Sequence, residues 1–90
     1  MARLPEPEER EFLEAMGVRL KLTRVARDLS QQELADAAEL SRVFIGAVER
    51  GRHGVNVIVL RRLARALGVR MGELIVEDGE RAEALFRDGS

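Results

Sequence analysis

The chain has 90 residues, of which 46% are apolar, and it contains no cysteine. This length suits one small domain with a single core, and the lack of cysteine excludes disulfides and thiolate metal sites. The formal net charge of -1 hides a basic middle between two acidic ends. Residues 1–17 carry a net -3, residues 18–72 a net +6 and residues 73–90 a net -4. Charge alone does not decide whether the basic middle binds a polyanion or is an ordinary solvated surface.

The N-terminal region has no apolar stretch typical of a signal peptide. No apolar run approaches the length of a membrane span. We therefore expect a cytoplasmic protein that does not contact membranes.

The first helix is predicted from about Glu8 to residues 27–28, because Pro5 and Pro7 are expected to hold the preceding residues out of it. Acidic residues in its first turn suit the helix dipole. Apolar and small residues recur there at helical spacing. The expected inner face is formed by Phe12, Leu13, Met16, Leu20 and Thr23.

Two short helices follow. Ser30 and Glu33 have the spacing of a capping box, which predicts a helix from Gln31 to about residue 38. Ser41 is a second N-cap candidate, and it predicts a helix over residues 42–50 that Gly51 ends. Residues expected to face inward in this pair are Leu34, Ala35, Ala38, Ile45 and Val48.

The rest of the chain is also predicted to be helical. Asn56 is expected to cap a fourth helix that Gly68 ends. Its expected inner face is Val57, Leu60, Leu63, Ala64 and Leu67, and a short fifth helix should supply Leu74 and Ile75. The sequence thus predicts an all-α, five-helix domain over residues 1–76, followed by a short helical extension over residues 77–90.

A pair of short helices joined by a tight turn, the second with a basic start, is typical of a helix-turn-helix. In this arrangement the second helix enters a DNA major groove about 12 Å wide. The first helix directs its N-terminus at a phosphate. Gln31, as the first residue of that helix, is therefore a candidate phosphate contact.

The segments "LSQQELADAAELSRVFIGAVERGR" and "LARALGV" resemble the lambda-repressor/Cro (XRE-type) family over roughly residues 16–76. The resemblance implies a five-helix domain that binds double-stranded DNA as a homodimer and regulates transcription. The segment "SRVFIGAVERGRHGVNV" is also similar to the controller proteins of restriction–modification systems. Three positions depart from the family pattern: Asp28 and Glu39 stand where the family has glycine, and Val55 where it has proline.

The resemblance also implies roles for individual residues. Arg24 and Glu49 match a buried structural pair, and Gln31 matches a phosphate contact. Arg42, Val43 and Ala47 match positions that face base edges. Phe44 has two equally open interpretations, a contact to a thymine methyl group or a place in the core. The complete predicted DNA-binding set is Gln31, Ser41, Arg42, Val43, Phe44, Ala47, Arg50, Arg52, His53 and Asn56.

Gly46 and Ala47 stand in the middle of the predicted groove helix. A glycine there costs up to about 1 kcal/mol relative to alanine, so its presence needs a reason. We expect small residues to let the backbone approach the bases closely. The alternative is that Gly46 permits close packing between helices.

Four apolar residues fall outside the predicted inner faces: Val18, Leu22, Val25 and Ile58. We expect Leu85 and Phe86 of the extension to cover them, in the same chain or in a second copy, and so to build or support a dimer. These apolar residues leave open an alternative function, an antitoxin or adaptor that acts through protein contacts. His53 is the single histidine, so we expect no enzyme activity, metal, cofactor or small-molecule ligand.

Overall fold

The computed structural model describes residues 6–75, so the predicted extension with Leu85 and Phe86 lies outside the described residues. Within that range the helices are α1 (Pro7–Ala26), α2 (Gln31–Ala38), α3 (Arg42–Glu49), α4 (Val57–Leu67) and the 3₁₀-helix η1 (Met71–Glu73). The same range contains no strand. The all-α prediction is thereby confirmed for the described residues.

The expected fifth α-helix is a single 3₁₀ turn, so the count of five α-helices is not confirmed by residues 6–75. Only five residues separate Gly68, which ends α4, from the buried Leu74. The turn is closed instead by the Glu73 carboxylate, which accepts the Arg70 backbone N–H at 2.7 Å.

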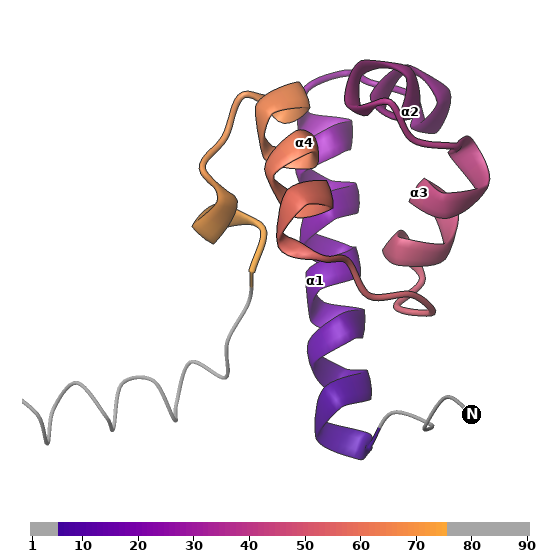
Figure 1. The fold of residues 1–90 in the computed structure, drawn as a ribbon, viewed down its shortest axis with the longest axis vertical. Helices are drawn as coiled ribbons and strands as arrows, with labels where there is room; N and C mark the ends of the chain where they lie inside the picture. Colours follow the sequence, from indigo (N-terminus) through magenta and orange to yellow (C-terminus); the bar gives the residue numbers. More distant parts are fainter. Residues whose placement is uncertain (1–5, 76–90) are drawn as a thin grey trace, which may run out of the picture.

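In Figure 1, α1 stands along the long axis of the molecule with α4 beside it, and α2 and α3 lie to one side. α3 packs on α1, and α2 packs against both α3 and α4. η1 contacts α4 on the side away from α3. This arrangement holds α2 and α3 as a unit at one flank of the long helix.

The beginning of α1 corrects the expectation for Pro7, which is the first residue of the helix rather than a residue held outside it. Proline fits the first helical position, because the amide hydrogen that it lacks would have no partner there. At the other end the helix stops at Ala26, and Asp28 adopts a positive φ of 56°.

Side-chain caps mark the beginnings of both α2 and α3. The Ser30 hydroxyl accepts the Glu33 backbone N–H at 3.0 Å, and the Glu33 carboxylate accepts the Ser30 backbone N–H at 2.8 Å. The turn itself passes through Glu39 in the left-handed region, at φ 59°. Ser41 then begins α3 by accepting the Phe44 backbone N–H at 3.0 Å.

The core gathers apolar side chains from all the helices. Its buried members are Met16, Leu20, Leu34, Ala35, Ala38, Ile45, Val48, Leu60, Leu63, Ala64, Leu67 and Leu74. The predicted inner faces were wrong at Val57, which is 65% exposed in the first turn of α4, and at Ile75, which is 37% exposed after the last turn. In both places the helical periodicity was extended to an end where the neighbouring elements no longer cover the side chain.

Gly17 sets the distance between α1 and α3, a role that the sequence analysis did not assign. A β-carbon at this position would lie 2.6 Å from the Glu49 backbone oxygen and would also collide with the Val48 oxygen. Only glycine therefore allows α1 to lie this close to the last turn of α3. The position of Gly17 in the middle of a predicted helix was the sequence signal that could have indicated this close packing, as it indicated a special role for Gly46.

Candidate nucleic-acid interface

α3 has one buried and one outward face. Ile45, Val48 and Glu49 are buried, whereas Arg42 and Val43 are exposed and Ala47 is half-buried. Val43 is 70% exposed, the largest exposure among the large exposed hydrophobic residues of the described chain. The side chains of Arg42 and Val43 are therefore accessible to a partner that meets the outward face of α3.

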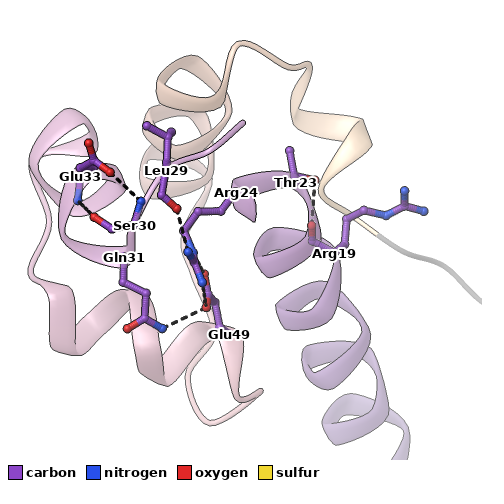
Figure 2. A network of polar contacts seen from close by, with 8 residues as sticks. All are labelled: Arg19, Thr23, Arg24, Leu29, Ser30, Gln31, Glu33 and Glu49. Atoms are coloured by element: carbon purple, nitrogen blue, oxygen red, sulfur yellow. Dashed lines mark hydrogen bonds and ion pairs between the residues drawn. The ribbon is translucent and has the colours of Figure 1, made fainter. Parts of the chain in front are cut away.

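An ion pair fastens α3 to α1 behind this face (Figure 2). Arg24 Nε donates to Glu49 Oε2 at 2.6 Å, and Arg24 Nη2 donates to Glu49 Oε1 at 3.1 Å. Arg24 Nη1 also donates to the Leu29 carbonyl at 2.8 Å. The two side chains expected to pair are thus brought together, with side-chain exposures of 10% and 3%.

The hydrogen bonds to the Glu49 carboxylate raise the pKa of the Arg24 guanidinium. Burial lowers this pKa by less than the hydrogen bonds raise it, and the negative charge of Glu49 raises it by a smaller amount again. The Arg24 guanidinium therefore stays charged at physiological pH, and its ion pair with Glu49 acts as a clamp between the first and third helices.

Gln31 joins this clamp, a contact that sequence reasoning missed. Its Nε2 donates to Glu49 Oε1 at 3.0 Å, as the dashed line in Figure 2 shows. The predicted phosphate contact is consequently oriented by the buried carboxylate rather than free to rotate. Nothing in the spacing of Gln31 and Glu49, eighteen residues apart, signalled the contact.

The loop after α3 carries the other predicted backbone contacts. Arg52 and His53 are exposed, and Asn56 uses its side-chain oxygen to accept the Val59 backbone N–H at 2.9 Å as the cap of α4. The ring of His53 meets that of Phe44 edge to face, with centroids 4.9 Å apart. Phe44 is half-buried and packs against the core, so it links α3 to this loop.

The orientation of His53 follows from its second contact. Its Nδ1 lies 2.6 Å from the Gly54 carbonyl oxygen, and a carbonyl only accepts, so Nδ1 donates there. The other ring nitrogen, Nε2, is left for an external partner. Within residues 6–75 no group of three or more histidine, aspartate, glutamate or cysteine side chains could hold a metal ion.

Searches among known proteins place this arrangement in a family. A model described as helix-turn-helix matches residues 20–74, and the chain belongs to that family. A hypothetical transcription factor from Neisseria meningitidis is 32% identical over 79 residues, which are 88% of this chain and 74% of the relative. Control protein C.SmaI from Serratia marcescens is 33% identical over 70 residues, 78% of this chain and 83% of the relative.

Solved structures agree with the sequence relatives. The restriction–modification controller protein C.AhdI from Aeromonas hydrophila superposes with a TM-score of 0.69 at 40% identity, covering 70% of this chain and 96% of that one. The hypothetical transcription factor NHTF from Neisseria superposes with a TM-score of 0.71 at 32% identity, covering 93% and 94%. The resemblance to the XRE-type family is confirmed, and its relatives include controller proteins.

Along the part of the chain that the structure describes, every helix is too short or too polar to cross a membrane.

Proposed function

We propose that this protein is a cytoplasmic transcriptional regulator that binds double-stranded DNA as a homodimer, with α3 in the major groove. The observation that carries the proposal is the outward face of α3, where the exposed Val43 stands beside the exposed Arg42. An arginine fork can bind a guanine edge, and an aliphatic side chain can contact a thymine methyl. Membership of the helix-turn-helix family supports the same use of this helix.

The neighbouring groups suit the DNA backbone rather than the bases. Gln31 begins α2, whose free N–H groups favour an anion. Arg50 and Arg52 lie at the end of α3 and in the following loop, and both are exposed. In this proposal α3 reads the sequence, while the start of α2, the end of α3 and the loop after it contact backbone phosphates. Ala47, one turn after Val43, stays a predicted close contact to the bases.

The test separates base reading from phosphate contact. A cognate duplex is first selected from a random pool, and binding is then measured on that duplex and on its single-base variants. Arg42→Ala should weaken cognate binding by about 1–3 kcal/mol and relax preference at one base pair. Arg52→Ala should weaken all duplexes alike and lower the slope of affinity against salt by about one unit. If the Arg42→Ala protein ranks the single-base duplex variants in the same order as the parent, Arg42 does not contact a base.

A second candidate, an antitoxin or adaptor that works through protein contacts, is favoured by one surface. Val18, Leu22 and Val25 form a stripe on the outer side of α1 and are 54–62% exposed. A protein whose main ligand is another protein should show no steep fall of DNA affinity with salt, whereas a DNA regulator should. The salt titration of the parent protein therefore decides between the two functions.

A further inference from the structure

Gly46 is buried in α3, yet it does not bring two helix backbones together as Gly17 does. A β-carbon on Gly46 would meet side-chain atoms as its three nearest neighbours: Arg50 Nη1 at 3.0 Å, Gln31 Nε2 at 3.8 Å and Arg50 Cζ at 3.9 Å. The space beside its α-carbon is thus filled by the ends of two polar side chains. This glycine makes room for an amide and a guanidinium.

Contacts within the fold place the side chains of Gln31 and Arg50 beside Gly46. Gln31 is held by the 3.0 Å bond from its Nε2 to Glu49, whose carboxylate is itself fixed by Arg24. Arg50 follows Gly46 by four residues, and helical side chains lean back toward the preceding turn. The guanidinium of Arg50 therefore lies over Gly46, next to the oriented amide of Gln31.

The charge of this cluster favours an anion. Arg24 and Glu49 neutralise one another in a 2.6 Å ion pair, which leaves the charge of Arg50 in excess. Among residues 6–75, no hydrogen bond or ion pair engages the Arg50 guanidinium, and Gln31 uses only its bond to Glu49. Donors therefore remain available on both side chains, at the edge of the exposed face of α3.

We propose that Gly46 is the floor of a single phosphate-binding site, in which the Gln31 amide and the Arg50 guanidinium donate to the same phosphate of the DNA backbone. The site deepens the proposed function and rests on it. Both nitrogens lie within 3.8 Å of one point. The oxygens of one phosphate can accept from donors so placed, because N–H···O bonds are about 2.9 Å long.

The site explains why a residue with poor helix propensity stands here. Alanine would be the better helix former. Its β-carbon, however, would press on Arg50 Nη1 at 3.0 Å, and a flexible side-chain end gives way where backbone would not. Alanine at this position should therefore leave the fold intact and displace the guanidinium from the phosphate.

The decisive variant is Gly46→Ala, with Gly72→Ala as a matched control, because a β-carbon on Gly72 meets nothing within 4 Å. Thermal melting is measured without DNA, and affinity for a non-specific duplex is measured between about 50 and 200 mM salt. Gly46→Ala should melt no lower than the parent but bind about tenfold more weakly, with a salt slope smaller by about one unit. Gly72→Ala should keep the affinity and slope of the parent.

Arg50→Ala completes the test, since Arg50 is exposed and its loss should not affect folding. It should lower the slope by the same unit, and Gly46→Ala added to Arg50→Ala should have no further effect, because both remove one contact. A Gly46→Ala protein with the parent's affinity and slope overturns the site, as does one that melts markedly lower. A parent that binds no duplex overturns the proposed function itself, whereas a binding parent with an unaffected Gly46→Ala overturns only the site.

Discussion

The buried charges of Arg24 and Glu49 are stable only as a pair. The side chain of Glu49 is 3% exposed and accepts from both Arg24 and Gln31. Removing one partner of such a pair strands the other charge away from water, which typically costs about 3–5 kcal/mol. We expect Glu49→Ala to lose stability in this range, measured by chemical denaturation.

A double variant that removes both charges tests whether the cost of Glu49→Ala comes from leaving Arg24 without a partner. Arg24→Met with Glu49→Leu should be less destabilised than Glu49→Ala, because neither charge is then left alone. If Glu49→Ala denatures at the same midpoint as the parent, the ion pair contributes nothing to folding and the tie between α1 and α3 lies elsewhere.

Gly17 offers a second prediction at single-residue scale. Alanine improves helix propensity, but here its β-carbon would overlap the carbonyl oxygens of Val48 and Glu49. Because these atoms belong to the backbone of α3, the whole helix must move, and overpacking of this kind costs about 1–3 kcal/mol. Gly17→Ala should therefore be destabilised by denaturation while Gly72→Ala is neutral. Equal stability of the two variants would mean that α1 and α3 separate without cost.

The two mid-helix glycines show where sequence reasoning reached its limit. Low helix propensity marked Gly46 as a residue needing a reason, but the reason depends on the ends of Gln31 and Arg50, which propensity does not describe. The expected pairing of Arg24 with Glu49 came from a family resemblance. Its third member, Gln31, depends on the three-dimensional meeting of α2 and α3.

Among the elements, α2 depends on its cap in a pH-dependent way. The backbone N–H and the hydroxyl of Ser30 hold the pKa of Glu33 below its ordinary value. The unfolded chain therefore takes up a proton on Glu33 at a higher pH than the folded chain, so stability rises with pH in that window. The contribution is complete above the ordinary glutamate pKa of about 4.3 and is lost as the pH falls through the lowered value.

We accordingly expect Glu33→Ala to be less stable than the parent at neutral pH, with the difference shrinking toward zero as the pH falls below about 4. Melting temperatures of both proteins across the acidic range measure this convergence. Glu33→Gln keeps an acceptor for the cap but removes the titration, so its difference from the parent should shift with pH in the same window. A constant gap between parent and Glu33→Ala at all pH values would contradict the cap's charge dependence.

Helical periodicity and caps predicted the elements well in their interiors and less well at their ends. Ser30, Ser41 and Asn56 cap α2, α3 and α4 as expected, because a side-chain oxygen followed by a helical run is a local signal. Pro7 and the segment of η1 were misjudged. Their conformation depends on which backbone groups remain unpaired and on how few residues the chain has before Leu74 must be buried.

At the scale of the whole molecule, the charge pattern and the fold agree. The basic middle segment forms the compact body, and arginines lie on α3 and in the loop after it. One domain presents one α3, whereas helix-turn-helix operators have half-sites about 34 Å apart. If the proposed function is right, recognition of such a site requires two copies, and we expect them to meet through an apolar surface.

Two exposed apolar surfaces could form the dimer interface. Away from α3, the apolar side chains more than half exposed among the described residues lie in two places: Val18, Leu22 and Val25 on α1, and Val57 and Ile58 at the start of α4. Light scattering at micromolar concentration should give a dimer, and footprinting on the selected duplex should protect two half-sites. Leu22→Asp should yield a folded monomer with much weaker binding if the stripe forms the interface, and Ile58→Asp should do so if α4 forms it. The two variants control for each other, since each adds one exposed charge. A parent that is strictly monomeric and protects no paired half-sites would contradict the dimer, because a single α3 would then account for all recognition.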